Sequence, residues 1–428
     1  MEIEELYSRF QVCGTVTTDS RHCPQGSMFI ALKGETFNGN AFAAQALAQG
    51  CRYAVVDEPE YARGESYILV DDCLQVLQQL ANYHRRQLKT PIIGITGTNG
   101  KTTTKELVSS VLSKKYKVLF TQGNLNNHIG VPLTLLRLNK EHEMAVVEMG
   151  ANHPGEIKAL VQIAEPDYGL ITNVGKAHLL GFGSFEGVIK TKGELYDFLR
   201  EKGNATIFIQ NENSYLNAIA HGLHCVRYGQ ASGLFVSGKL LSCSPFLAFE
   251  WMSERNTYPV QTHLIGAYNL DNALASVAVG KYFDVAPEDI CEALSTYMPQ
   301  NNRSQLVDTG RNKLIVDAYN ANPTSMMAAL ENFRQVQAPH KMVILGDMKE
   351  LGEASLEEHR KIVGFLDGCR FDRVMLAGPE FKAVASAYEH FDNVDAVKEA
   401  LEKSKPVGFT ILIKGSNSMK LSQLPAYL

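Results

Sequence analysis

The stretch that decides the fold is Gly94-Ile-Thr-Gly-Thr-Asn-Gly-Lys-Thr-Thr-Thr104. An apolar run, Ile92–Ile95, leads into it and predicts a buried strand, and the residues from Lys105 onward have the spacing of an amphipathic helix. The glycines therefore lie at a strand-to-helix turn, where backbone N–H groups and the helix N-terminus can surround a phosphate. We interpret the stretch as a phosphate loop.

The residue types of this loop suit nucleotide chemistry. Gly97 and Gly100 let the backbone close round a phosphate, Lys101 adds a positive charge, and Thr102 can ligate Mg²⁺. One position departs from the general Gly-x-x-x-x-Gly-Lys-Thr pattern, because Ile95 stands where glycine is usual. A chance Gly/Thr turn is the alternative, and Gly-Lys-Thr directly after a clear strand argues against it. The residues predicted to contact the nucleotide phosphates are Gly97, Thr98, Asn99, Gly100, Lys101, Thr102 and Thr103.

Composition bounds the class of protein. The length of 428 residues predicts about two to four domains, and 45% hydrophobic with 20% charged residues is typical of a globular protein. A net charge of −5 argues against a general nucleic-acid binder. The chain has no apolar run of membrane-spanning length, and its first five residues do not resemble a signal peptide. We expect a cytoplasmic monomer with no membrane span, and the eight scattered Cys predict reduced thiols.

The residues before the loop predict a small α/β domain. Strand-like runs at 27–32 and 53–56 flank an Ala-rich helical stretch at 41–49. A helical pattern over Leu74–Leu88 ends before Pro91, which places a domain boundary at residue 89.

Beyond the loop, polar residues follow predicted strands. An apolar strand at 144–150 carries Glu148 at its tip, where an acid faces metal-bound phosphates in a phosphate-loop fold. His178 follows the next strand, 168–174, at the same edge. Glu148 is therefore a candidate metal ligand, with a solvent-facing side chain as the alternative, and His178 is either a ligand or structural.

Two further segments have two interpretations each, and a pair of lysines has one. The Asn- and Gly-rich stretch 121–136, with Asn126 and Asn127, is a substrate loop or a long polar turn. Asn269 and Asn272 lie one helical turn apart and bind a base edge or cap the helix. Lys190 and Lys192 lie in a helical stretch and would ordinarily be solvated helix surface.

The last part of the chain predicts a parallel, doubly wound sheet. Met298-Pro299 and the polar residues 300–304 mark a second boundary. Strand-like runs at 313–317, 342–347, 373–378 and 409–416 then alternate with helical stretches. The expected fold is therefore α/β in three domains, residues 1–89, 90–298 and 299–428.

Several blocks together resemble the Mur ligase family. The compact loop Thr-Gly-Thr-Asn-Gly-Lys-Thr is similar to the ATP loop of these enzymes and of their folylpolyglutamate-synthase relatives. Residues 18–21 (Thr-Asp-Ser-Arg) and 26–34 resemble the N-terminal domain that holds the UDP end of a UDP-muramoyl substrate, although Asp-Ser-Arg alone would be an ordinary turn. The blocks at 148–157, 317–323, 345–352 and 414–416 are most similar to the members that add D-alanyl-D-alanine to UDP-N-acetylmuramoyl-tripeptide.

The resemblance implies a fold and a reaction. It implies a UDP-substrate domain, a central ATPase domain with a mainly parallel sheet, and a Rossmann-like C-terminal domain that binds D-Ala-D-Ala. With ATP and Mg²⁺, such a ligase joins D-Ala-D-Ala to UDP-MurNAc-tripeptide through an acyl phosphate, in peptidoglycan precursor synthesis. Folylpolyglutamate synthase and a phosphate-loop ATPase switch are the rival functions. Diaminopimelate and lysine both stay open for the third residue of the peptide.

The resemblance also implies residue roles. The implied metal ligands are Thr102, Glu148, His178 and Lys192, the last standing where the family has a carbamylated lysine. The implied nucleotide contacts outside the loop are Asn269 and Asn272 for adenine, Arg303 for the γ-phosphate and Asp317 for the ribose. Lys101, Lys192 and Arg303 are the implied catalytic residues. The implied substrate contacts are Ser20, Arg21, Lys33, Asn126, Asn127, Asn320 and Asn322. Two positions depart from the family, Asn302 where Gly often precedes the arginine and Tyr268 where His is common.

Overall fold

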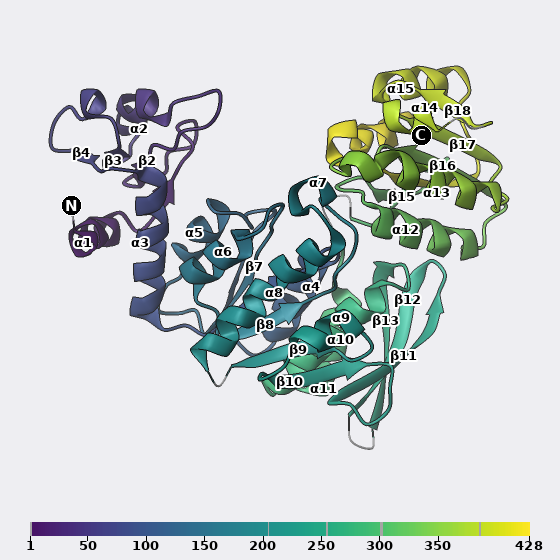
Figure 1. The fold of residues 1–428 in the computed structure, drawn as a ribbon, viewed down its shortest axis with the longest axis horizontal. Coiled ribbons are helices and arrows are strands. Elements are labelled where there is room, and N and C mark those ends of the chain that lie inside the picture. Colours follow the sequence, from purple (N-terminus) through teal and green to yellow (C-terminus); the bar gives the residue numbers. More distant parts are fainter. Residues whose placement is uncertain (1, 204, 254–255, 300–302, 385–386) are drawn as a thin grey trace.

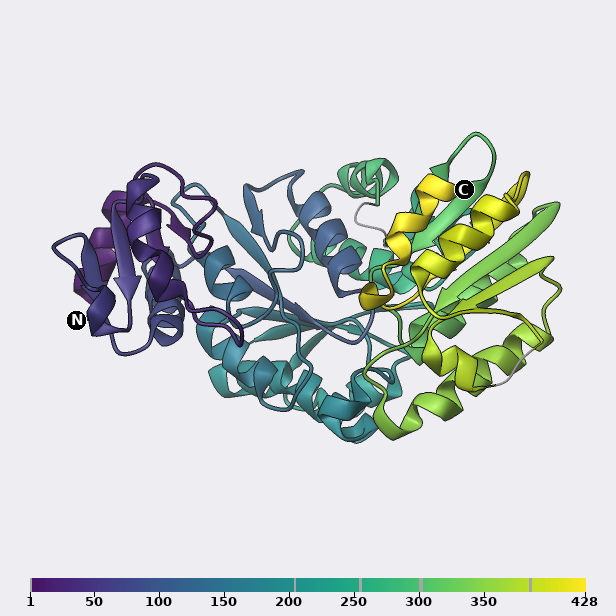
Figure 2. The same cartoon turned by 90° about the horizontal axis from the view of Figure 1, so that it is seen from above.

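The computed structural model describes residues 2–203, 205–253, 256–299, 303–384 and 387–428. The chain forms three lobes in sequence order, each built on its own β-sheet (Figure 1). A view at right angles shows the first and third lobes at opposite ends of the central lobe (Figure 2). The polar residues 300–302 of the predicted second boundary, including the departure at Asn302, lie outside the described residues.

The first lobe is a four-stranded parallel sheet with flanking helices. Its strands follow the sequence order β1 (Val16–Thr17), β2 (Met28–Ile30), β3 (Tyr53–Val56) and β4 (Tyr67–Leu69). The helices are α1 (Ile3–Cys13), η1 (Gly39–Phe42), α2 (Ala43–Ala48), η2 (Pro59–Tyr61) and α3 (Cys73–Leu88). The predicted strands and the Ala-rich helix are confirmed.

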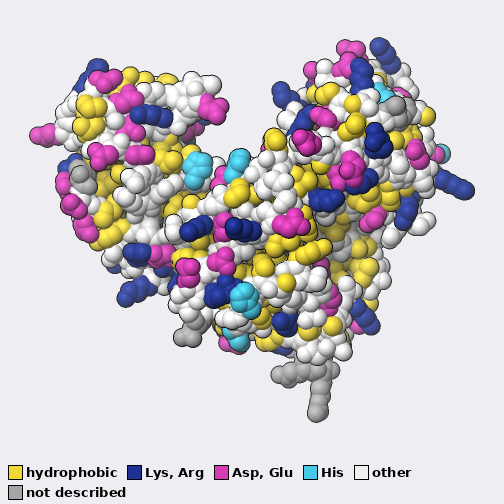
Figure 3. Space-filling model, in the orientation of Figure 1, with side chains coloured by type: hydrophobic (Ala, Val, Ile, Leu, Met, Phe, Trp, Pro, Cys, Tyr) yellow, Lys and Arg dark blue, Asp and Glu magenta, His cyan; other side chains and the backbone are white. Residues whose placement is uncertain are grey.

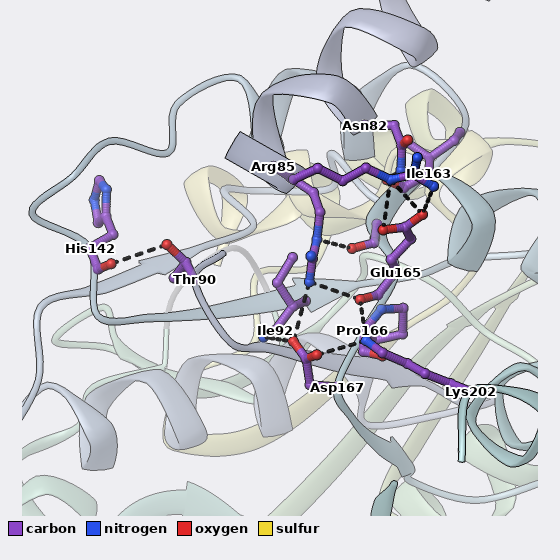
Figure 4. A network of polar contacts seen from close by, with 12 residues as sticks. Asn82, Arg85, Thr90, Ile92, His142, Ile163, Glu165, Pro166, Asp167 and Lys202 are labelled. Atoms are coloured by element: carbon purple, nitrogen blue, oxygen red, sulfur yellow. Dashed lines mark hydrogen bonds and ion pairs between the residues drawn. The ribbon is translucent and has the colours of Figure 1, made fainter. Parts of the chain in front are cut away.

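Helix α3 connects the first lobe to the central one through a polar network (Figure 4). Asp72 caps its N-terminus by accepting from the Gln75 N–H, and Lys89 ends it in a left-handed conformation. Near that end, Arg85 donates to the carbonyls of Ala164 and Glu165, both at 2.9 Å. The Ala164 carbonyl ends helix α6 and has no partner within it, so the arginine satisfies a group that would otherwise be unpaired, whereas the Glu165 carbonyl also accepts from Lys202 at 3.2 Å.

The central lobe is a nine-stranded sheet with the order β13-β12-β11-β10-β9-β8-β5-β7-β6. Neighbouring strands are parallel up to β11, and β11, β12 and β13 are antiparallel. The strands are β5 (Ile92–Thr96), β6 (Val118–Phe120), β7 (Met144–Glu148), β8 (Tyr168–Ile171), β9 (Thr206–Gln210), β10 (His224–Gly229), β11 (Val236–Cys243), β12 (Phe246–Ser253) and β13 (Asn256–Ile265). The helices are α4 (Lys101–Leu112), α5 (Gly130–Leu135), α6 (Glu156–Ala164), α7 (Leu179–Phe182), α8 (Phe185–Lys202), α9 (Ser214–Ile219), α10 (Asn269–Tyr282) and α11 (Pro287–Thr296). The predicted mainly parallel sheet is confirmed.

The pairing of β5 positions the site. This strand is buried throughout and lies between β7 and β8, with Ile95 beside Glu148 and Thr96 beside Ile171. The carboxyl ends of the three parallel strands therefore meet at one edge, which is where doubly wound sheets bind ligands.

The third lobe is a six-stranded sheet with the order β14-β15-β19-β16-β17-β18, parallel except for the edge strand β14. Its strands are β14 (Gln305–Asp308), β15 (Lys313–Asp317), β16 (His340–Gly346), β17 (Arg373–Ala377), β18 (Glu389–Phe391) and β19 (Phe409–Lys414). Its helices are α12 (Pro323–Gln335), η3 (Gly352–Ala354), α13 (Ser355–Asp367), α14 (Pro379–Ala383), α15 (Val394–Lys403), η4 (Asn417–Met419) and η5 (Leu421–Tyr427). The doubly wound arrangement predicted from the strand and helix order is confirmed.

The apolar cores do not follow the lobes one to one. One cluster runs from Leu6 in α1 through the first lobe to Ala220 below the central sheet, and a second covers the other face of that sheet. The third lobe has two apolar clusters of its own. Among the buried residues described, Ile265 is the one member of these clusters that comes from the central lobe. Among the described residues, no helix has the length and apolar character needed to cross a membrane.

Candidate active site

The phosphate loop lies between β5 and α4 and is held by the end of β8. Gly97 has φ +142°, and a Cβ there would lie 2.1 Å from the Thr172 hydroxyl, so only glycine fits. The Thr98 N–H donates to the Asn173 carbonyl, and the Asn99 N–H donates to the Asn173 side-chain oxygen, both at 2.9 Å. The loop is thus shaped by its neighbouring strand before any ligand binds.

The Lys101 ammonium folds back over this loop. Its Nζ donates to the carbonyls of Gly97 at 2.8 Å and Thr98 at 3.1 Å. Burial lowers the pKa of Lys101, Glu148 opposes this shift, and Arg303 adds to it. The amine is therefore poised to exchange neutral carbonyl partners for anionic phosphate oxygens, which bind it more strongly.

Glu148 occupies the tip of β7 as predicted and is almost fully buried. Its Oε1 accepts from the Thr102 hydroxyl at 3.1 Å and from the Asn126 amide at 2.8 Å. Its Oε2 is buried and has no hydrogen-bond partner among the described residues. A buried carboxylate oxygen without a partner is costly, and a cation would satisfy it.

The donor set at this point fits a magnesium ion. Mg²⁺ keeps several waters and binds one or two protein carboxylates together with substrate phosphates, so it needs no all-protein cage. Within the described residues, no three His, Cys, Asp or Glu side chains form a cluster suited to a metal. Thr102 and Glu148 would hold the ion at the phosphate loop.

His178 lies at the edge predicted for it, directly before α7. It lines the same cavity as Glu148, and its Nδ1 contacts the carboxylate of Glu350 from the third lobe. Burial lowers the pKa of His178, and Glu350 opposes that shift. The structure therefore pairs the predicted ligand with a partner 172 residues away in the sequence.

Lys192 is buried in α8, whereas Lys190 is exposed. The Lys192 ammonium donates to the Ala151 carbonyl at 3.2 Å and lies 5.2 Å from the centre of the Phe182 ring. Burial, followed by the charge of Lys101, lowers the pKa of Lys192 well below its usual value. The interpretation of both lysines as solvated surface is therefore correct for Lys190 and wrong for Lys192, because α8 turns that face toward the core.

Asn269 and Asn272 lie on one face of α10 beside the phosphate loop. Asn272 accepts from the Thr104 hydroxyl at 3.0 Å and donates to Asn269, which donates to the Ile265 carbonyl, both at 2.8 Å. The N-cap residue of α10 is Tyr268, whose side chain makes no capping hydrogen bond. The alternative interpretation, in which these asparagines cap the helix, is therefore wrong. The two amides instead join α10 to α4 and line the cavity.

Arg303 and Asp317 come from the third lobe. The Arg303 guanidinium stacks on the Tyr319 ring at 3.8 Å from its centre. Asp317, at the end of β15, forms an ion pair of 2.5 Å with Lys414, whose side chain is buried. Both predicted residues face the central lobe across the same cavity.

The amides predicted for substrate binding also shape loops. Asn127 accepts from the backbone N–H groups of Ile129 and Gly130, at 3.1 and 2.9 Å. Asn322 caps α12 in a reciprocal capping box and donates to Asn99 of the phosphate loop at 2.8 Å. These residues line the cavity with Asn126 and Asn320, so the structure brings all four together.

Ser20, Arg21 and Lys33 lie on the first lobe, apart from this cavity. Arg21 is exposed and forms a bidentate pair with Asp19, both bonds at 2.9 Å. Lys33 bridges Asp57 and Glu58, also at 2.9 Å. Figure 3 shows a hollow between the first and third lobes, over the central lobe.

The cavity itself has a volume of about 980 Å³ and is walled by the central and third lobes. It contains residues to which the sequence patterns assign no role. Tyr319 supports Arg303, Lys414 neutralises Asp317, and Asn173 holds the phosphate loop. Asn173 and Lys414 both stand at strand ends, which is the signal that could have identified them.

Comparison with known proteins gives a consistent result. The Mur ligase family catalytic domain matches residues 14–85, the Mur ligase middle domain 95–280, and the Mur ligase glutamate ligase domain 302–417. UDP-N-acetylmuramoyl-tripeptide--D-alanyl-D-alanine ligase of Bacillus subtilis is 37% identical, over 96% of this chain and 92% of that protein. The crystal structure of MurF from Acinetobacter baumannii has a TM-score of 0.88 and 31% identity, covering 99% of this chain and 97% of that one. MurF from Thermotoga maritima, solved with ADP, has a TM-score of 0.86 and 26% identity, covering 97% of each chain. The chain belongs to the Mur ligase family.

Proposed function

We propose that this protein is an ATP-dependent ligase that joins D-alanyl-D-alanine to UDP-N-acetylmuramoyl-tripeptide in peptidoglycan precursor synthesis. The observation that carries the proposal is the shared cavity, in which a phosphate loop and a buried carboxylate of the central lobe face Arg303 and Asp317 of the third lobe. The relative from Bacillus subtilis carries the name of this activity and aligns over nearly the whole chain.

The predicted site residues divide into three proposed roles, and among them Gly97 and Lys192 do not line the cavity. The phosphate loop, residues 97–103, holds the ATP phosphates, Asn269 and Asn272 hold adenine, and Asp317 holds the ribose. Thr102 and Glu148 bind one Mg²⁺, with His178 as a further ligand and Lys192 supporting a second ion. Lys101 and Arg303 act on the transferred phosphoryl group.

The chemistry explains why cations gather there. The tripeptide carboxylate attacks the γ-phosphate of ATP and releases ADP, and the amine of D-Ala-D-Ala then displaces phosphate from the acyl phosphate. The first step brings two anions together, so Lys101 and Arg303 lower the barrier by offsetting the repulsion and the charge of the transition state. Bound Mg²⁺ would supply further neutralisation of the phosphate oxygens. Acyl phosphates are hydrolysed by water, so a cavity enclosed between two lobes would also protect the intermediate by excluding water.

We infer that Lys192 is carbamylated. Carbamylation requires a neutral amine, which attacks CO₂ and loses a proton to give a carbamate, and the lowered pKa of Lys192 favours that form. A carbamate also converts a cation into a carboxylate-like ligand, which suits a magnesium site better than an ammonium group does.

The lobes receive proposed roles as well. Residues 1–89, with Ser20, Arg21 and Lys33, bind the UDP end of the substrate. Residues 90–298 bind ATP, and Asn126 and Asn127 at the cavity contact the UDP-MurNAc-tripeptide substrate. Residues 299–428, with Asn320 and Asn322, bind D-Ala-D-Ala. Because the reaction consumes ATP, we infer a cytoplasmic enzyme, and we propose that it acts as a monomer, which light scattering would test.

A phosphate-release assay tests the proposed function. In the presence of ATP, Mg²⁺ and D-Ala-D-Ala, we expect phosphate release only when UDP-MurNAc-tripeptide is added. Comparing the rates with the diaminopimelate form and the lysine form of the tripeptide then identifies its third residue. Without D-Ala-D-Ala, hydroxylamine should trap the acyl phosphate as a hydroxamate. Thermal stabilisation by a folate but not by UDP-MurNAc-tripeptide would indicate folylpolyglutamate synthase, and ATP turnover without either substrate would indicate an ATPase switch.

A further inference from the structure

The contact between His178 and Glu350 joins the central and third lobes at the mouth of the cavity. The Glu350 carboxylate contacts His178 Nδ1, and the Glu350 carbonyl accepts from the Leu180 N–H at 3.2 Å. Gly352 lies against the same turn, since a Cβ there would be 3.3 Å from the Leu180 side chain. The η3 segment of the third lobe is thus seated on α7 of the central lobe.

Both residues of this contact have unusual backbone conformations. His178 has φ +50° and Glu350 has φ +65°, and neither is glycine. Left-handed non-glycine residues are uncommon and persist where the surrounding structure determines them. The two strained positions therefore place the imidazole and the carboxylate opposite each other from separate lobes.

The geometry suits a metal ligand with an outer partner. A histidine that binds a metal through one ring nitrogen almost always donates its other N–H to a carboxylate or carbonyl, which sets the tautomer and the ring orientation. In His178 the Nδ1 has a carboxylate, and the structure records no hydrogen-bond partner for Nε2 among the residues it describes. The ring also lines the cavity that contains Glu148.

We propose that Glu350 is a positioning residue for His178: it holds the imidazole with Nε2 available to the metal, and it does so only while the third lobe is seated on the central one. This inference rests on the proposed function, in which His178 is a magnesium ligand. Its consequence is a metal site that is completed by docking of the C-terminal lobe.

The same seam supplies matched controls. Lys176 of the central lobe forms an ion pair of 3.0 Å with Glu358 of the third lobe, and within the described residues it has no hydrogen bond or ion pair with His178. Glu353, three residues after Glu350, is exposed. Lys176→Met therefore tests docking without the His178 contact, and Glu353→Gln tests loss of a nearby negative charge.

The experiment measures binding of Mn²⁺, a paramagnetic substitute for Mg²⁺, to the full-length protein with ADP by electron paramagnetic resonance. We expect Glu350→Gln to weaken Mn²⁺ binding by about tenfold, as the loss of an outer partner of a metal ligand does. We expect Glu350→Asp to recover part of this loss. Glu353→Gln should change the affinity by less than about threefold, because the structure shows no bond between Glu353 and His178 among the residues it describes. Lys176→Met, which only weakens docking of the third lobe, should lower the affinity by about fivefold at most.

A double variant separates positioning from simple electrostatics. In a His178→Ala background, Glu350→Gln should have no further effect on Mn²⁺ affinity, because its partner is already gone. Nitrogen NMR of labelled histidine should show a change in the His178 tautomer signals in Glu350→Gln and not in Glu353→Gln. The proposal is overturned if Glu350→Gln binds Mn²⁺ like the wild type, if it still weakens binding without His178, or if Glu353→Gln causes an equal loss. Failure of the proposed function is a different result, in which the wild type and His178→Ala bind Mn²⁺ equally well.

Discussion

The first lobe meets the central lobe across a shared apolar core and a buried arginine, whereas the third lobe meets it mainly across scattered polar contacts, with a small apolar contact at Ile265. At the first seam, one apolar cluster extends from Leu6 to Ala220, and Arg85 is bonded to the end of α6 (Figure 4). At the second seam, Asn99 pairs with Asn322 and Lys176 pairs with Glu358. We call these the apolar seam and the polar seam.

The difference identifies where the molecule can move. Separating the lobes at the apolar seam would expose core side chains to water, at about 25 cal/mol for each Å² of apolar surface. Separating them at the polar seam exchanges a few hydrogen bonds for bonds to water, each with a net value of about 1 kcal/mol. The cavity lies at the polar seam, so the enzyme can open to admit substrates and close for the reaction. Variants at the polar seam should therefore change activity, and variants at the apolar seam should change stability.

The largest expected effect is the loss of activity in Lys101→Ala at the polar seam. We expect ligation to fall by about 10³-fold or more, because a charge clamp on the transferred phosphoryl group is removed. The melting temperature should stay close to that of the wild type, since the ammonium bonds only two carbonyls of its own loop. Phosphate release and calorimetry measure the two quantities. Ligation within about tenfold of the wild type in a folded variant would contradict the assignment.

The next largest effect should be the loss of stability in Arg85→Ala at the apolar seam. Removing this buried guanidinium leaves the Ala164 carbonyl unpaired and takes one charged partner from Asp167, which keeps Lys202 and the Ile92 N–H, at a cost of about 3 kcal/mol. Calorimetry should show a lower melting temperature. Arg86→Ala is the matched control: its side chain is 61% exposed, so its pair with Glu165 should contribute less than about 1 kcal/mol. Equal losses in the two variants would show that burial does not distinguish these arginines.

Lys192→Ala tests whether a buried lysine supports the chemistry at the polar seam. We expect activity to fall by about 100-fold, as when a group that supports a metal is removed, and added short-chain carboxylates should restore part of it. Lys190→Ala should stay near the wild type, because Lys190 is exposed on the same helix. Full activity of Lys192→Ala, or electron density of an unmodified lysine with ATP and Mg²⁺ bound, would rule out the carbamate.

The smallest effect should be that of Lys176→Met, which weakens docking of the third lobe. A partly exposed ion pair contributes about 1 kcal/mol or less, so the ratio of closed to open molecules should fall by about fivefold at most. Small-angle scattering without nucleotide would detect a larger average radius of gyration. Lys361→Met is the control, since Lys361 reaches the same Glu358 oxygen at 3.0 Å from within the third lobe. An equal expansion in both variants would mean that Glu358 stabilises the third lobe itself and not its docking.

The sequence by itself determined those features that depend on a local pattern. The strand before Gly97, the helix after Lys101 and the carboxylate at the tip of β7 follow from apolar spacing, glycine positions and the rule that parallel strands share an edge. Sequence resemblance added the family, and the alternation of strands and helices predicted the doubly wound third lobe. The strands β12, β13 and β14 were not predicted, because antiparallel strands lack the crossover helices that mark parallel ones. The strands β9, β10 and β11 were also not predicted, although β9 and β10 pair in parallel and follow helices.

Only the tertiary structure decided which distant groups meet. Asn99 and Asn322 are 223 residues apart, His178 and Glu350 are 172 apart, and Asp317 and Lys414 are 97 apart, so no spacing in the sequence relates them. The burial of Lys192 also depends on how α8 packs, since a two-residue step along a helix separates it from exposed Lys190. The physical reason is that local propensity acts within one turn or strand, whereas the cavity is formed by the way separately folded lobes pack against one another.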